Sequence, residues 1–311
     1  MRVKTKLPGM SWKKDWQRNK LVYLIFLPVF AYFFILHYLP LFGIVMAFQD
    51  FRLARGVFGS RWVGLENFII LFTGDAFPTA IRNTVIIALF NLTLSFFAPI
   101  IFALIITSLP YKRVKRMTQT ISYMPNFVAM VVVANLVQLF LGYDGALTSF
   151  LTLLGFEQQN WLANPNPPIF WLILTFSGIW QGFGYGSIMY VAAISNVSDE
   201  LYEAAAIDGA NRWQRVWKIT IPSILPLIVM MWTLMAGVSL KVGFDKVLLL
   251  YMPQTFAVAD NMFTYTFRMA FSHPSDFGLA AASGLFQSLI GTVMLVGFNK
   301  IGRRISEITL F

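Results

Sequence analysis

Apolar residues along this 311-residue chain gather into six long segments that are separated by shorter polar stretches. Each segment can form a helix that crosses the hydrocarbon core of a bilayer, which takes about 20 apolar residues. The pattern predicts an all-α, polytopic membrane protein, with residues 1–20 as a basic tail and 21–311 as a six-helix transmembrane domain. The transmembrane helices are expected near residues 21–47, 83–109, 120–142, 169–194, 224–242 and 278–299.

Three prolines inside these segments predict interruptions, because proline lacks the N–H that a helix interior needs. Pro28 and Pro40 lie in the first segment, and Pro125 lies near the start of the third. We therefore expect bends in the first and third transmembrane helices.

Residues 199–226, between the fourth and fifth apolar segments, have the pattern of a polar helical hairpin. Ser198 precedes Asp199 and Glu200, and a serine followed by acidic residues is typical of a helix N-terminus. Gly209 is expected to end this helix by adopting a positive φ. The stretch thus predicts a first helix that runs from Asp199 to just before Gly209.

A second short helix is predicted directly after the first. Trp213, Val216 and Trp217 follow one another at helical spacing and form an apolar stripe. Pro222 then lies where the next membrane helix is expected to begin, a place where proline is tolerated. The same pattern is found in amphipathic helices that lie on a membrane surface, so periodicity alone leaves this alternative open.

The distribution of lysine and arginine predicts the orientation. Basic residues are concentrated in the N-terminal tail, at 112–116 and at 300–304, whereas the stretch between the third and fourth segments has Asp144 and Glu157 and no base. By the positive-inside rule both termini are cytoplasmic, and so are residues 199–226. This bias also accounts for the net charge of +10, which therefore gives no reason to expect a nucleic-acid partner.

Composition excludes several functional classes. The chain is 57% hydrophobic and only 12% charged, whereas soluble domains are about 25% charged. It has no cysteine and two histidines, so neither a thiolate site nor another metal centre is expected. No phosphate-binding GxxxxGK[ST] loop occurs. The apolar segments lack the buried acidic chain of a proton-driven carrier, and no catalytic pair of side chains is evident.

The fourth segment carries small and aromatic residues close together, from Trp180 and Gln181 through Gly182 to Tyr185 and Gly186. The spacing of Gly182 and Gly186 allows another helix to approach closely. The same residues could instead form a polar, aromatic strip on a pore. Such a strip suits sugars, whose ring faces stack on aromatic side chains and whose hydroxyls bind amides and phenols.

The hairpin has a recognisable string. Glu203-Ala204-Ala205, Gly209 six residues after Glu203, and the later Ile219-Thr220-Ile221-Pro222 resemble the EAA loop of binding-protein-dependent ABC importer permeases. In that family the loop is a pair of coupling helices that docks into a groove of the ATPase subunit. The resemblance assigns this role to Glu203, Ala204, Ala205, Asp208, Gly209, Ala210, Trp213, Trp217 and Pro222.

The resemblance also implies positions that contact the solute. In maltose-type members these lie on the fourth membrane helix, about five turns before the EAA glutamate, and counting back from Glu203 reaches Gly182 and Tyr185. The fifth helix also lines the pore in this family. The expected solute-contacting residues are Trp180, Gln181, Gly182, Tyr185, Trp232, Met235 and Ser239.

The resemblance extends over nearly the whole chain from about residue 20 and is best to the LplB-type sugar permeases, which are linked to uptake of oligosaccharides from polysaccharide breakdown. It implies a type I ABC importer permease in a bacterial cytoplasmic membrane, without a cofactor of its own. Its partners would be a second, homologous permease, two copies of a cytoplasmic ATPase that binds ATP and Mg²⁺, and an extracytoplasmic solute-binding protein. An importer of a non-sugar solute and an ATP-independent carrier or channel are the alternatives.

Overall fold

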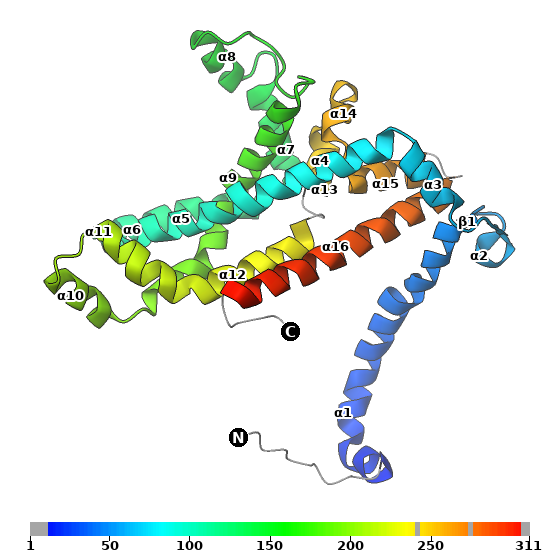
Figure 1. Cartoon of the computed structure of the whole chain (residues 1–311), viewed down its shortest axis with the longest axis horizontal. Helices are drawn as coiled ribbons and strands as arrows, with labels where there is room; N and C mark the ends of the chain where they lie inside the picture. The colour runs from blue at the N-terminus through cyan, green and yellow to red at the C-terminus, as the bar shows by residue number, and fades with distance from the viewer. Residues whose placement is uncertain (1–11, 240–242, 273–275, 306–311) are drawn as a thin grey trace.

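The computed structural model describes residues 12–239, 243–272 and 276–305, which are mostly helical (Figure 1). Residues 1–11 of the predicted basic tail and 240–242 of the fifth apolar segment lie outside this range. The elements are α1 (Trp12–Phe33), β1 (Gln49–Asp50), α2 (Gly56–Gly59), β2 (Arg61–Trp62), α3 (Glu66–Thr73), α4 (Ala76–Phe90), α5 (Phe96–Thr107), α6 (Lys112–Tyr123), α7 (Met130–Leu141), α8 (Ala146–Leu153), α9 (Pro167–Ser195), α10 (Asp199–Ile207), α11 (Arg212–Arg215), α12 (Ile221–Val238), α13 (Phe244–Leu250), α14 (Phe256–Ala259), α15 (Met262–Ser272) and α16 (Phe277–Ile305).

Five described stretches are long and apolar enough to cross a membrane: Asp15–Phe48, Ala76–Thr107, Met130–Leu153, Arg212–Gly237 and Phe277–Arg303. They correspond to five of the six predicted segments. The remaining segment, predicted at 169–194, forms α9, whose polar and glycine residues lower its mean hydropathy. At 29 residues, α9 is about 44 Å long, so the structure is compatible with six crossings.

Two predicted boundaries are wrong. The second segment begins at Ala76 instead of residue 83, because Phe77 and Ala80 are buried in an apolar cluster with α15 and α16. The third segment is not one helix. Its first part belongs to α6, which also includes the basic residues at 112–116, between the second and third predicted segments, and α7 starts only at Met130.

Two of the three prolines lie where the α-helical hydrogen-bond pattern is interrupted. Pro125 lies in a 3₁₀ turn that separates α6 from α7, so the predicted interruption is confirmed. Ahead of Pro40 the α-helical pattern gives way to a π-helical turn at 34–38 and then a 3₁₀ stretch at 39–48. Pro40 cannot donate to the carbonyl four residues earlier. Pro28, in contrast, lies within α1 without ending it.

Helix α9 is the centre of the bundle. Near its N-terminal end Phe170 and Leu174 pack in an apolar cluster with α7, α13 and α14. Near its other end Tyr190 and Ile194 pack with α5 and α12 in a second cluster. Helix α9 therefore connects these two apolar clusters through packed side chains, and α10 follows it directly in the chain.

The hairpin α10–α11 lies at one end of the elongated bundle, and the small antiparallel pair of β1 and β2 lies at the other (Figure 1). Helix α1 extends away from the rest of the bundle. None of the residues in its most apolar stretch is buried. So large an apolar surface must be covered by lipid or by another protein.

Candidate coupling surface and solute path

Helix α10 begins where the sequence predicts. The Ser198 hydroxyl oxygen accepts a hydrogen bond from the backbone N–H of Glu200 at 3.3 Å, which satisfies one of the free donors of the first turn. Asp199 and Glu200 lie in that turn, where the helix dipole favours negative charge. The local sequence thus accounts for the start of α10 without any tertiary contact.

The end of α10 depends on Gly209, whose φ is +76°. The Gly209 N–H donates to the Ala206 carbonyl at 3.1 Å, and the Ala210 N–H donates to the Ala205 carbonyl at 2.8 Å. This pair of bonds is a Schellman motif, in which a residue with positive φ satisfies the last carbonyls of a helix. No atom lies within 4 Å of a Cβ built on Gly209, so the backbone conformation, and not lack of space, requires glycine. The predicted positive φ is confirmed.

The second helix of the hairpin is capped and then continues into the membrane. The Asn211 side chain accepts from the Gln214 N–H at 2.9 Å, and the Gln214 side chain accepts from the Asn211 N–H at 2.8 Å. After α11 a π-helical turn at 216–220 leads without a break into α12. Pro222 lies in the first turn of α12, as predicted, although the π-helical turn makes the helical path from α11 continuous.

Most predicted coupling residues are exposed to solvent. Glu203, Ala204, Asp208, Gly209 and Pro222 are exposed, and Ala205 and Ala210 are half-buried. Beside them Ile207, which the sequence analysis did not single out, exposes 87% of its surface. The tip of the hairpin thus presents acidic side chains and one exposed apolar side chain together.

The two tryptophans of the hairpin lie next to a different surface. Trp213 and Trp217 are 74% and 64% exposed. With residues of α5 such as Phe97 and Ile101 they line an apolar cavity of about 770 Å³. Tryptophan is common at the membrane interface, so the structure does not group these two residues with the tip of α10.

Close helix contact on α9 involves Gly184, which was not predicted, and Gly186, one member of the predicted pair. A Cβ on Gly184 would lie 2.0 Å from the carbonyl oxygen of Ser122 in α6, and one on Gly186 would lie 3.4 Å from the Pro99 Cβ. Nothing lies within 4 Å of a Cβ on Gly182. Gly184 and Gly186 therefore allow neighbouring helices to approach, whereas Gly182 faces open space.

The aromatic and amide residues of α9 have distinct surroundings. The Gln181 amide donates to the Val128 carbonyl at 3.2 Å. Tyr185 is 48% exposed, and its ring meets Phe127 edge-on at 6.0 Å between centroids. Trp180 lines an apolar cavity of about 730 Å³ between α7, α8 and α9. Trp180 and Tyr185 are thus the exposed rings of the predicted strip, at 45% and 48%, and Gly182 is half-buried with open space at its Cβ position.

The predicted residues of α12 lie inside the bundle. The Trp232 indole N–H donates to the Leu92 carbonyl at 3.2 Å, and Met235 is half-buried in the cluster of α5, α9 and α12. Ser239 is 1% exposed, and its hydroxyl donates to the Ala236 carbonyl at 2.8 Å. The structure does not bring these three residues onto the open surface of Gly182 and Tyr185, and their contact with solute stays a prediction.

A buried polar network connects α4 to the α14–α15 region. The Asn83 amide donates to the carbonyls of Ala257 at 3.1 Å and Asp260 at 2.9 Å, and Asp260 forms an ion pair with Arg268. Burial raises the pKa of the Asp260 carboxyl, while Thr264 and Arg268 act in the opposite direction. The sequence does not reveal this network, because Asn83 lies over 170 residues from Ala257 and Asp260.

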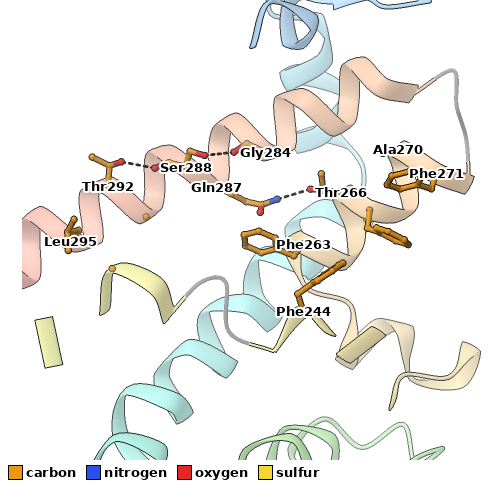
Figure 2. Close-up of a pocket in the computed structure, with 13 residues that line it drawn as sticks. Phe244, Phe263, Thr266, Ala270, Phe271, Gly284, Gln287, Ser288, Thr292 and Leu295 are labelled. Carbon is orange, nitrogen blue, oxygen red and sulfur yellow. Dashed lines mark hydrogen bonds between the residues drawn. The ribbon is translucent and has the colours of Figure 1, made fainter. Parts of the chain in front are cut away.

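A further cavity of about 670 Å³ lies between α12, α13, α15 and α16 (Figure 2). The rings of Phe244 and Phe263 line it, and the Gln287 amide donates to Thr266 Oγ1 at 2.7 Å and to the Met262 carbonyl at 2.9 Å. The Gln287 amide nitrogen already donates to two oxygens of α15, so the remaining lining of the cavity is mainly apolar. Within the described parts of the chain no group of three metal-ligating side chains comes together.

Comparison with known proteins gives concordant similarities. Residues 95–307 match the family described as "Binding-protein-dependent transport system inner membrane component". Protein LplB of Bacillus subtilis (strain 168) is 34% identical over 306 residues, covering 97% of this chain and 95% of that protein. The polygalacturonan/rhamnogalacturonan transport system permease protein YteP of the same organism is 35% identical over 293 residues, covering 93% and 90%.

The fold is similar to that of a chain in a bacterial alginate ABC transporter solved in complex with an alginate pentasaccharide-bound periplasmic protein. The TM-score is 0.87 at 34% sequence identity, over 96% of this chain and 99% of that chain. A crystal structure of a bacterial ABC transporter involved in the import of the acidic polysaccharide alginate gives a TM-score of 0.86 at 35% identity, over 94% and 98%.

Proposed function

This chain belongs to the family of inner membrane components of binding-protein-dependent transport systems, and from that premise we propose that it forms half of the pore of an ATP-driven importer of acidic oligosaccharides. The chain is the non-catalytic, membrane-embedded permease of an ABC importer. This membership removes the alternative of a self-contained carrier or channel. We further propose its partner subunits, its solute and the residues that contact them.

The observation that carries the coupling role is the hairpin α10–α11. Its tip exposes Glu203, Asp208 and the apolar Ile207, which suits docking into a groove of an ATPase subunit. The hairpin is joined to α9 on one side and continues into α12 on the other. A displacement of the hairpin would therefore move both helices, as rigid-body alternating access requires.

A second permease is supported by helix α1. Its apolar side chains, such as Leu24, Ile25 and Phe30, are more than half exposed, and α1 extends away from the bundle (Figure 1). We expect part of this surface to pack on a homologous, non-identical permease and the rest to face lipid. The pore would lie between the two permeases, with Gly182 and Tyr185 on this side of it.

The cargo is inferred from the relatives. YteP is named for transport of polygalacturonan and rhamnogalacturonan, and the structural neighbour takes part in import of the acidic polysaccharide alginate. We infer that the solute is an oligosaccharide from polysaccharide breakdown, delivered by an extracytoplasmic binding protein. An importer of a non-sugar solute is the remaining alternative, and the exposed ring of Tyr185 favours a sugar.

ATP and Mg²⁺ are assigned to two copies of a separate cytoplasmic ATPase, since the sequence has no phosphate-binding loop. The hairpin must then face the cytoplasm. The termini are assigned to the same side, in agreement with the distribution of basic residues.

The test is a gentle detergent purification of the tagged chain from its own membranes, with every co-purifying protein identified. We expect an ATPase and a second permease, and their complex should import oligosaccharide into proteoliposomes only with ATP and binding protein. Loss of the ATPase, but not of the second permease, on Glu203→Arg replacement would support docking at α10. Recovery of the chain alone, with ATP-independent transport, would refute the proposal.

A further inference from the structure

Lys246 of α13 is a buried cation without a partner. It is 5% exposed, and none of the hydrogen bonds found among the described residues involves its side chain. The ion pairs in the described ranges are Arg52–Asp50 and Arg268–Asp260. The neighbouring Asp245 is exposed and makes no ion pair with Lys246, and the sequence of 240–242 and 273–275 contains no aspartate or glutamate.

The ammonium group lies beside the middle of α9. A Cβ built on Gly178 would be 3.6 Å from the Lys246 Nζ, so the missing side chain of Gly178 leaves room for the charge. Gly178, Gly182 and Tyr185 are separated by four and then three residues, which places them on one face of the helix. The cation is therefore next to the face of α9 on which Gly182 is open and Tyr185 is accessible.

A charge in this position is unfavourable unless an opposite charge binds it. Burial of most of the side chain removes part of the hydration of the ammonium group, although Nζ itself is not among the fully enclosed unpaired atoms. Charged side chains at membrane depth are usually paired or serve a pathway. The apolar neighbours Val247 and Leu250 are 0% and 1% exposed and offer no compensation. Lys246 thus offers a positive charge that no carboxylate of the described residues neutralises.

We propose that Lys246 binds a carboxylate of an acidic sugar as the oligosaccharide passes along the Gly178–Gly182–Tyr185 face of α9. The inference rests on the proposed function and deepens it, because it assigns selection for uronic-acid residues to one side chain. The ammonium pairs with the carboxylate, while Tyr185 offers a ring face to the sugar and Gly182 leaves space for it. A neutral sugar would leave the lysine unpaired and would bind less tightly.

The experiment measures binding of trigalacturonate and of its carboxyl-reduced, neutral counterpart to the assembled permease–ATPase complex, without binding protein. Leaving out the binding protein removes its own selectivity from the result. The variants are Lys246→Gln and Lys246→Met, with Lys246→Arg as the conservative change. Lys20→Gln, which removes an exposed lysine of α1, is the matched control.

We expect Lys246→Gln and Lys246→Met to raise the Kd for trigalacturonate roughly 10- to 100-fold, the range for loss of one charge-assisted bond. The Kd for the neutral trisaccharide should stay unchanged, Lys246→Arg should retain part of the preference, and Lys20→Gln should behave as wild type. Because an unpaired buried charge is removed, Lys246→Met should unfold at the same or a higher temperature than wild type.

Three results would overturn the inference: equal weakening of both trisaccharides, no change in either, or loss of the second permease from the complex. The last result would mean that the lysine pairs with a carboxylate of the other subunit. Failure of the proposed function is distinguishable, because the wild-type complex would then lack an ATPase or would import no oligosaccharide with ATP. If wild type imports only neutral sugars, the importer stands and the role of Lys246 does not.

Discussion

Gly209 shows how one residue connects a sequence motif to a mechanism. Its positive φ ends α10, and its neighbours Ala205 and Ala210 complete the Schellman motif. A residue with a Cβ costs about 1–2 kcal/mol in this conformation, and a β-branched residue is particularly unfavourable there. The EAA spacing thus positions a glycine at the one place in the hairpin where the chain needs a left-handed residue.

We predict that Gly209→Val uncouples transport from ATP hydrolysis, because the end of α10 would be reshaped. In proteoliposomes the uptake per ATP hydrolysed should fall severalfold or more while the complex is still present in the membrane. Gly209→Asn is the matched control, since asparagine tolerates positive φ, and it should retain most of the coupling. Wild-type uptake by the Val variant would remove the claim.

Gly182 and Gly184 are two residues apart on α9 and have opposite surroundings. A Cβ on Gly184 would overlap the carbonyl of Ser122, whereas Gly182 has free space. We predict that Gly184→Ala separates α9 from α6 and lowers stability by about 1–3 kcal/mol, measured as a lower unfolding temperature of the purified chain. Gly182→Ala should leave that temperature unchanged. Equal effects would mean that both glycines are packed.

At the scale of elements, the sequence predicted what depends on local chemistry. The start of α10 at Ser198, its end at Gly209 and the break at Pro125 follow from caps and from a missing N–H. Helix α6 is not among the helices that the sequence predicts, because basic residues at 112–116 indicate orientation and do not by themselves indicate a helix. Helix α6 contacts α9 where Gly184 meets Ser122, and no short stretch of sequence contains that contact.

A side-chain hydrogen bond connects α10 to the helical turn before α12, and its role can be tested. The Tyr202 and Thr220 hydroxyls lie 2.9 Å apart, and this bond holds the first coupling helix to the base of the membrane helix. We predict that Tyr202→Phe and Thr220→Val each lower the uptake per ATP hydrolysed. The interaction energy between the two hydroxyls should be about 1 kcal/mol. A double-mutant cycle measures it. If the two changes are additive, the bond does not transmit the motion.

At the scale of the whole molecule, the sequence could not say which pore candidates share a surface. Trp232 and Ser239 fit the pattern of a pore helix, yet their polar atoms are bonded inside the bundle. Lys246 lies outside the predicted segments, and only the fold brings its ammonium beside Gly178. The sequence does show a lysine shortly after a predicted membrane helix. Whether that side chain is buried depends on the tertiary structure.

The orientation of the whole molecule can be determined directly, because the chain has no cysteine. The basic helix α6 and the hairpin contribute Lys115, Tyr202 and Arg215 to one cavity of about 490 Å³, so the basic residues of α6 and the proposed ATPase site are on the same side of the membrane. We predict that Glu200→Cys in α10 reacts with a membrane-impermeant maleimide only in inverted vesicles. Asp144→Cys, between α7 and α8, should react only in intact cells; both positions are exposed. Labelling of Glu200→Cys from outside would place the hairpin where no ATPase could reach it, and the coupling role would fail with the orientation.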